Sequence, residues 1–316
     1  MEKEIIITDK EKGVLRITTL NERWYARPSQ NKESGLPTYE FLPSSTWIAS
    51  YYPKGIGFYK WLADKGWDEA EALKIAAGDK GSKVHYACGD IDMGEKIDVI
   101  SSKYMNNSTG QPETLTIEEV ECIMSYIKFL EDYKPQILLN EGSFFGEFYA
   151  GTIDKIFRIG EEIWILDIKT SKSIWEEYKM QISSYSHMDI DYKSMSITDE
   201  EWKNRKLFIL QVGYKLNRAG YKLTEIPDKY DLFVNVAYRT WKNENPDAKP
   251  KEAEYPLILK SDFRISQLPS KKEEMPPPDD FIDTLNQEVE ELSGASEIVK
   301  GEPKVVKRPK KKDVLP

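Results

Sequence analysis

The sequence has few cysteines and histidines and no long apolar stretch. Its 316 residues include two Cys and two His. Two thiols cannot supply the four ligands of an ordinary iron–sulfur cluster, and so few cysteines favour a reduced chain over a disulfide scaffold. Because no run of 18 or more apolar residues occurs, we expect no membrane-spanning helix. The 8 Trp, 18 Tyr and 11 Phe supply ample material for a buried core.

Negative charge exceeds positive charge, and the positive charge is unevenly spread. The 45 Lys and Arg are outnumbered by 54 Asp and Glu, for a net charge of −9, which argues against a protein that coats nucleic acid non-specifically. Residues 300–316 are the exception, because they hold seven Lys and Arg but two acids. A nucleic-acid enzyme is compatible with this balance if positive charge collects around one groove. The charged residues 1–13 do not resemble a secretory signal peptide and predict a cytoplasmic protein.

Composition divides the chain near residue 267. Beyond it lie the stretch SKKEEMPPPDD, at 270–280, and the lysine-rich end. We therefore expect a single domain over 1–267 and a disordered, Pro- and Lys-rich tail over 268–316. Within the tail, residues 279–292 fit either a short amphipathic helix for a partner or a solvated linker. The basic end either contacts DNA or only improves solubility.

Hydrophobic spacing predicts both helices and strands before the tail. Helices are expected at 55–64, 67–92, 116–133 and 174–188, the third of them beginning with the capping box Thr116–Glu119. Strands are expected at 139–149, 151–159, 162–169, 206–214 and 231–239. Because strands and helices interleave, the fold class is α/β or α+β.

The stretch GTIDKIFRIGEEIWILDIKTSK, at 151–172, predicts a β-hairpin. A two-residue turn at Gly160-Glu161 suits a type II′ turn, because glycine tolerates the first position. This register pairs apolar residues across the two strands: Ile153 with Ile168, Ile156 with Ile165, and Phe157 with Trp164. The hairpin is therefore expected to be largely buried.

The same register places Asp154 opposite Asp167, with Cβ atoms about 5 Å apart. Lys169 lies two residues after Asp167 and on the same face. Opposed carboxylates repel each other unless one of them binds a proton or a cation lies between them. Carboxylate oxygens are the ligands that Mg²⁺ prefers, so the segment fits a metal site built on strands. It equally fits a pair of strand-end aspartates that are solvated or bound to Lys169.

Two helices carry further candidates. His85 follows Gly81 on an expected helix, where a neutral imidazole can ligate a metal, although a lone helical histidine is more often structural. Gln181 and Tyr185 are four residues apart and share one helix face. They suit contacts to phosphate or support of the site, although this spacing is common in any helix. We expect His187 to be an ordinary surface or packing residue.

Taken in order, these stretches resemble motifs of one nuclease family. They are G-S-K-V-H (81–85), A-G-T-I-D (150–154), L-D-I-K-T (166–170) and Q-I-S-S-Y (181–185), preceded by an entry segment at 42–81. The chain resembles the RecB-like exonuclease branch of the PD-(D/E)xK nuclease superfamily over residues 42–240. It lacks the four cluster-binding cysteines of some relatives, which favours the phage-like and mitochondrial genome-maintenance subgroup.

The resemblance implies a restriction-endonuclease-like core, with a central mixed β-sheet flanked by helices. It implies an Mg²⁺- or Mn²⁺-dependent DNA exonuclease that acts on DNA with a free end, in replication, recombination or repair of a phage or prophage. Such a protein would work in the host cytoplasm, with other recombination or replication proteins as partners of its tail. The alternatives are a structure-specific endonuclease of the same fold, a non-catalytic DNA-binding subunit and a metal-binding structural protein.

The resemblance also implies roles for single residues. His85, Asp154 and Asp167, with the main-chain carbonyl of Ile168, would hold the Mg²⁺ or Mn²⁺ ion. The position of Asp167 is Glu in many relatives, and either carboxylate ligates metal. Lys169 would orient the attacking water or neutralise charge in the transition state.

Other residues are expected around this centre. Gln181 and Tyr185 would fix the substrate backbone or the catalytic lysine. Phosphate contacts are expected from Thr170, Ser171 and Lys172. A second ion would need another acid, for which Glu141 and Glu147 are candidates. Four aromatic residues could stack on single-stranded bases or belong to the core: Trp47, Tyr51, Tyr52 and Trp61.

Overall fold

A computed structural model describes residues 15–18, 22–30 and 37–250. Three predictions lie outside the described residues: the domain end at 267, the tail over 268–316 and the helix at 279–292. In the described part of the chain, no helix combines the length and the apolar character needed to cross a membrane.

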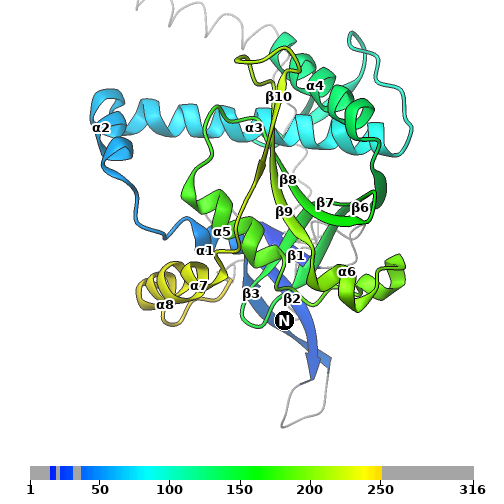
Figure 1. Cartoon of the computed structure of the whole chain (residues 1–316). Helices are drawn as coiled ribbons and strands as arrows, with labels where there is room; N and C mark the ends of the chain where they lie inside the picture. Colours follow the sequence, from blue (N-terminus) through cyan, green and yellow to red (C-terminus); the bar gives the residue numbers. More distant parts are fainter. Residues whose placement is uncertain (1–14, 19–21, 31–36, 251–316) are drawn as a thin grey trace, which may run out of the picture. The chain divides into compact units, whose positions relative to one another are not determined.

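A five-stranded mixed sheet forms the centre of the described fold (Figure 1). Its order is β10 (Tyr221–Glu225), β9 (Lys206–Val212), β8 (Glu162–Lys169), β7 (Ala150–Ile159) and β6 (Gln136–Phe145). Strands β8 and β9 are parallel and the other neighbours are antiparallel. Parallel strands need a crossover connection, and α5 (Glu176–Tyr185) lies in it. The predicted mixed sheet flanked by helices is therefore confirmed.

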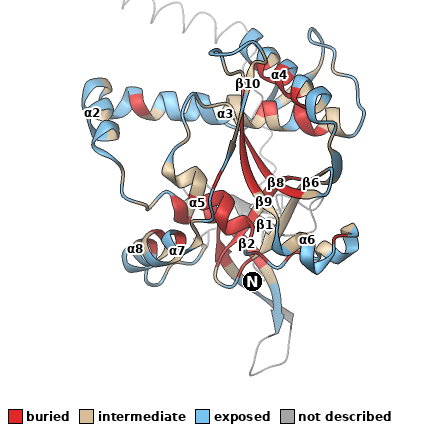
Figure 2. Ribbon diagram, in the orientation of Figure 1, coloured by how far each residue is buried: buried red, intermediate tan, exposed pale blue. Residues whose placement is uncertain are grey.

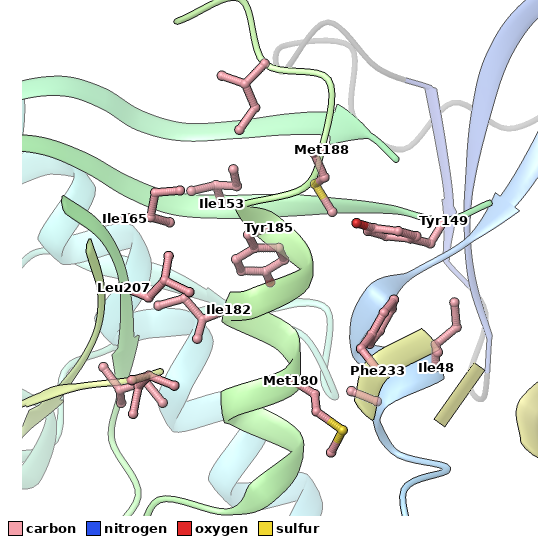
Figure 3. Close-up of a cluster of buried hydrophobic side chains, with 14 of the residues drawn as sticks. Ile48, Tyr149, Ile153, Ile165, Met180, Ile182, Tyr185, Met188, Leu207 and Phe233 are labelled. Atoms are coloured by element: carbon pink, nitrogen blue, oxygen red, sulfur yellow. The ribbon is translucent and has the colours of Figure 1, made fainter. Parts of the chain in front are cut away.

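Both faces of the sheet are buried. On β8, Ile163 and Ile165 belong to one core cluster, whereas Trp164 and Leu166 belong to another. The first cluster includes side chains of α5 and α1 (Ser45–Ala49) and is drawn in Figure 3. The second includes side chains of α3 (Trp67–Asp92) and α4 (Ile117–Tyr133). Burial on both faces explains the continuous apolar run that the sequence shows in β8.

The predicted hairpin is confirmed in its turn and register. Ile159 pairs with Glu162, so the loop is Gly160-Glu161. The φ of Gly160 is +61°, as the first position of a type II′ turn requires. The predicted apolar pairs at this end are present: Ile156 with Ile165 and Phe157 with Trp164. The helix at 116–133 also begins with its predicted capping box.

The predicted strand at 231–239 is wrong, because this stretch is helical. It forms α7 (Tyr230–Leu232), the π-helix η2 (Phe233–Tyr238) and α8 (Arg239–Glu244). The buried residues Phe233, Ala237 and Trp241 recur every fourth position, which places them on one helix face. β-Branched and aromatic composition predicted a strand, but burial follows the helical spacing. The fifth strand of the sheet is instead β10, which was not predicted.

Several shorter elements surround the sheet. A three-stranded antiparallel sheet contains β1 (Leu15–Thr18), β2 (Arg23–Gln30) and β3 (Pro37–Pro43). A small hairpin joins α3 to α4 through β4 (Lys103–Asn106) and β5 (Gln111–Thr114). The connection from α5 to β9 contains the short helices η1 (Tyr192–Met195) and α6 (Asp199–Lys203).

Helix α2 (Ile56–Lys65) and the start of α3 have little contact with the core. No residue of α2 is buried, and Ala70 is the one buried residue among the described residues 67–80. Figure 2 shows this region as mostly exposed. Apolar side chains on exposed helices of this kind indicate a contact surface.

Candidate active site

The ladder between β7 and β8 ends where the acidic residues begin. Its last pair is Lys155 with Leu166, so Asp154 and Asp167 are the next residues on their strands rather than a ladder pair. Asp154 Oδ2 instead accepts a hydrogen bond of 2.8 Å from the backbone N–H of Ile168. The predicted ladder pairing of Ile153 with Ile168 is therefore absent. The two strands separate at this point, and the Asp154 carboxylate accepts the Ile168 N–H in place of a backbone carbonyl.

Helix α3 brings His85 to this opening. Its Nδ1 lies 3.4 Å from Asp154 Oδ1, and its Nε2 lies 2.9 Å from the carbonyl oxygen of Ile168. His85 therefore contacts the Asp154 side chain and the Ile168 carbonyl oxygen, two groups that are predicted to bind the same metal ion as His85. Three elements, α3, β7 and β8, meet at this point.

Lys169 lies on the other side of the opening, facing α5. Its Nζ is 2.6 Å from Asp167 Oδ2 and 3.2 Å from Gln181 Oε1. The ammonium also lies 4.8 Å from the centre of the Tyr178 ring, within cation–π range. Gln181 Nε2 in turn donates to Tyr185 Oη. Lys169 thus contacts Asp167 and Gln181 directly, and Tyr185 is linked to the lysine through Gln181.

The pKa values of the two aspartates shift in opposite directions, because the nearby positive charges favour Asp154 more than Asp167. Burial alone raises the pKa of Asp154, but His85, Lys169 and the N–H of Ile168 outweigh it and lower that pKa. Burial raises the pKa of Asp167 to about 6, with Lys169 opposing and Asp154 reinforcing the shift. A buried carboxylate beside a second carboxylate thus lacks enough positive charge nearby.

The two basic groups respond to the same carboxylates. Burial lowers the pKa of His85, but the Asp154 carboxylate outweighs it and the pKa is raised. Burial likewise lowers the pKa of Lys169, and Asp167 and Asp154 more than compensate. Lys169 is therefore a full positive charge at neutral pH, as its predicted role requires.

The buried Asp167 carboxylate has Lys169 as its charged partner. Its Oδ2 lies 2.6 Å from Lys169 Nζ, and no other described residue donates to that oxygen. In the described part of the chain, no three His, Cys, Asp or Glu side chains stand close enough to form a ready-made metal site. The predicted ligands are two carboxylates, an imidazole and a main-chain oxygen, of which the oxygen donors suit Mg²⁺ or Mn²⁺.

The three predicted phosphate-contacting residues follow β8 directly. Thr170 lies beside α3, since a Cβ on Gly81 would stand 3.9 Å from Thr170 Oγ1. The Ser171 carbonyl accepts a hydrogen bond of 2.9 Å from Gln211, and its hydroxyl donates to the Ser173 carbonyl. Lys172 is exposed. Ser171 is thus occupied by internal contacts, whereas Lys172 is open to solvent.

The two candidate acids for a second ion differ in position. Asn140 pairs with Lys155 and Gly142 with Ile153, which puts Glu141 opposite Asp154. Glu141 also has a φ of +53°, a costly conformation for a residue with a side chain. Glu147 instead lines a cleft of about 410 Å³ together with Arg27 and His187.

The aromatic candidates divide between core and surface. Three of them are partly buried against the first core cluster: Trp47, Tyr51 and Tyr52. Trp61 is 38% exposed on α2. His187 is an exposed packing residue, as predicted, because its ring stacks on Tyr230 and its Nε2 contacts Asp228.

Three partners of the site were not identified from the sequence. Tyr178, three residues before Gln181, lies over the Lys169 ammonium. Thr46 on α1 accepts a hydrogen bond from Gln181. Asp92 on α3 forms a buried ion pair with Lys155, the neighbour of Asp154. The spacing of Tyr178 on the helix of Gln181 was the one local signal, since the other two contacts join distant segments.

No protein-family model matches this chain, and a search of curated proteins finds no similar sequence. The family resemblance therefore stays a prediction that rests on the motifs.

Proposed function

We propose that this chain is a metal-dependent DNA exonuclease with a restriction-endonuclease-like core. The observation that carries the proposal is the buried Asp167 carboxylate, whose pKa is raised to about 6 by burial and by Asp154 even though Lys169 is its ion-pair partner. Such an arrangement is costly for a fold and is typical of a functional site. A divalent cation would relieve the repulsion, and the adjacent lysine suits phosphoryl chemistry.

The proposed chemistry is hydrolysis of a phosphodiester bond. Asp154, Asp167, His85 and the Ile168 carbonyl would hold Mg²⁺ or Mn²⁺, which supplies Lewis acidity toward the phosphate. Lys169 Nζ, fixed by Asp167 and Gln181, places a positive charge where negative charge builds up in the transition state. Asp154 also fixes the backbone of Ile168 and keeps its carbonyl beside His85.

Thr170 and Lys172 are proposed to contact a neighbouring phosphate. They follow Lys169 without a break, so a phosphate displaced by one nucleotide along the strand falls within their reach. Lys172 is exposed and can meet a phosphate that remains in solvent. Ser171 is a weaker candidate, because its hydroxyl already donates within the loop.

The exposed segment at 54–81 supports a substrate with unpaired bases. It leaves the fold beside the site, where Lys54 Nζ is 2.6 Å from Glu177 of α5. It returns beside the site, where Gly81 faces Thr170. Between these points it exposes three aromatic side chains: Tyr59, Trp61 and Trp67. Aromatic rings of this kind stack on bases of any sequence.

A preference for DNA ends follows from the same segment. Because both of its anchors lie beside the site, a strand that passes under the aromatic residues enters most easily by its end. The family resemblance points the same way and favours a role in phage DNA replication, recombination or repair. Partner proteins and binding through the tail remain part of that proposal.

The test is a timed digest of end-labelled linear single- and double-stranded DNA, beside a covalently closed circle. With Mg²⁺ we expect release of label from linear DNA, no cutting of the circle, and no reaction in EDTA. Efficient cutting of the circle would instead identify an endonuclease. DNA binding without cleavage in Mg²⁺ or Mn²⁺ would identify a non-catalytic binding subunit, and stabilisation by metal without DNA binding would identify a structural metal site.

A further inference from the structure

The Gln181 side chain makes three polar contacts at once. Its Oε1 accepts from Lys169 Nζ at 3.2 Å, while its Nε2 donates to Thr46 Oγ1 at 2.9 Å and to Tyr185 Oη. An amide group has two N–H donors, so both are used. The amide is therefore fully engaged by three elements, β8, α1 and α5.

These contacts fix which end of the amide faces the lysine. With the amide rotated by half a turn, Nε2 would face the Lys169 ammonium, and two donors would meet. The hydroxyls of Thr46 and Tyr185 can donate or accept, whereas the Lys169 ammonium only donates, so the lysine selects this orientation and the two hydroxyls then accept both N–H groups. Gln181 is 8% exposed, so its amide depends mainly on these protein partners.

Thr46 reaches this network from a separate helix. Helix α1 begins after the N-cap Ser44, whose hydroxyl accepts from the N–H of Trp47. Thr46 itself is exposed. The Thr46 hydroxyl is therefore neither buried nor the cap of α1. Its observed hydrogen bond is the one that it accepts from Gln181.

We propose that Thr46 is a positioning residue for the nuclease site. Its hydroxyl holds the Gln181 amide so that Oε1 points at Lys169, and Lys169 is thereby aimed between Gln181 and Asp167. The inference rests on the proposed function, in which Lys169 acts on the scissile phosphate. Thr46 itself contacts neither the lysine nor the carboxylates.

Loss of the hydroxyl leaves one buried N–H of Gln181 without an acceptor. The amide then rotates to find another partner, and Lys169 is left with Asp167 alone. A misaimed lysine weakens stabilisation of the transition state without weakening binding of DNA or metal. We expect kcat to fall about tenfold in Thr46→Val, with KM for DNA and the dissociation constant for Mn²⁺ unchanged.

The experiment compares Thr46→Val with Thr46→Ser. Valine has the shape of threonine without the hydroxyl, whereas serine keeps the hydroxyl and should retain the wild-type rate. The variant Gln181→Met, alone and combined with Thr46→Val, completes a double-mutant cycle. We expect Thr46→Val to have no further effect on kcat once Gln181 is replaced.

A second readout does not depend on catalysis. The side-chain amide protons of Gln181 give an NMR signal that Gln181→Met identifies by its loss. In Thr46→Val this signal should shift and exchange faster with solvent, and in Thr46→Ser it should stay close to the wild type.

An unchanged amide signal or an unchanged kcat in Thr46→Val overturns the inference, as does an equal fall in Thr46→Ser. If the wild-type protein cleaves no DNA, the proposed function fails, and the amide signal still decides whether Thr46 holds Gln181.

Discussion

Two lysine–aspartate pairs lie close together in this fold and differ in how fully they are satisfied. Lys155 and Asp92 are 1% and 0% exposed. Lys155 also donates to Asn140, and both Asp92 oxygens accept from the hydroxyl of Tyr126. In the other pair, Lys169 is 16% exposed, and no described residue other than Lys169 donates to the buried Asp167 Oδ2.

The difference indicates that the pair of Lys155 and Asp92 supports the fold, whereas the pair of Lys169 and Asp167 belongs to the proposed reacting site. The pair of Lys155 and Asp92 joins β7 to α3, so it fixes the helix of His85 against the strand of Asp154. Every polar atom named in that network has a partner, as expected of a structural ion pair. In the pair of Lys169 and Asp167, the aspartate has the lysine as its charged partner and the lysine keeps access to solvent, as the proposed reacting site requires.

The largest expected effect on cleavage comes from changes to the pair of Lys169 and Asp167. Asp167→Asn keeps the shape of the side chain but removes the charge that would bind the cation. We expect the cleavage rate to fall by about a hundredfold to a thousandfold, because removal of one electrostatic group costs roughly this much at an active site. End-labelled linear DNA in Mg²⁺ measures the rate. Asp199→Asn on exposed α6 is the matched control and should cleave normally.

Lys169→Met should abolish cleavage to a similar extent, with Lys193→Met as its exposed control. A normal rate in either Asp167→Asn or Lys169→Met would show that the chemistry lies elsewhere.

A change to the pair of Lys155 and Asp92 should lower the stability of the fold. Asp92→Ala leaves the Lys155 ammonium buried without its carboxylate, which costs about 3–5 kcal/mol of unfolding free energy. Urea unfolding measures this loss. Replacement of both charges, by Asp92→Leu with Lys155→Met, should recover part of it, since no buried charge then remains. Equal stability of Asp92→Ala and the wild type would contradict a structural role for the pair.

The same Asp167→Asn variant should be more stable than the wild type when metal is chelated. Burial raises the pKa of Asp167 from 3.8 to about 6, so the folded protein holds this proton more tightly than the unfolded chain. The free energy of unfolding therefore falls as the pH rises from about 4 to 6, and the penalty is complete above that range. Removal of the charge should recover on the order of 2 kcal/mol at pH 8 in EDTA and nothing near pH 4.

Unfolding midpoints of Asp167→Asn and the wild type across this pH range decide the point. A variant less stable than the wild type at pH 8 would mean that Lys169 fully satisfies the carboxylate.

The smallest expected effect concerns the exposed aromatic residues of α2. Trp61→Ala should weaken binding of a single-stranded oligonucleotide by about 1 kcal/mol, the lower end of what stacking contributes per base. Fluorescence anisotropy in Ca²⁺, with cleavage suppressed, measures the affinity. Leu216→Ala, an exposed apolar residue at 83% exposure, is the control. Equal affinities would remove α2 from the proposed DNA path.

Local signals predicted the parts of the site that are close in sequence. Glycine at position 160 and the alternation around it gave the turn and register of the hairpin, and hence the neighbouring positions of Asp154, Asp167 and Lys169. The same alternation could not show that the ladder stops at Lys155. His85, which contacts Asp154 and the Ile168 carbonyl at that end, comes from a helix about seventy residues earlier in the printed sequence.

Errors and omissions have the same physical origin. The stretch at 231–239 has strand-like composition, but it is packed as a helix because Phe233, Ala237 and Trp241 recur with helical spacing. Thr46 and Asp92 acquire their roles only when distant elements meet. Sequence patterns predict the candidate catalytic residues, whereas tertiary contacts determine which other residues orient those side chains.

Calorimetric titration of Mn²⁺ into the protein without DNA tests the central claim most directly. The wild type should bind the ion, and Asp167→Asn should bind it at least about tenfold more weakly, with His85→Ala also weakened and Asp199→Asn unchanged. Equal Mn²⁺ affinity in the wild type and Asp167→Asn, or no binding to either, would contradict a cation site at the open end of the β7–β8 ladder.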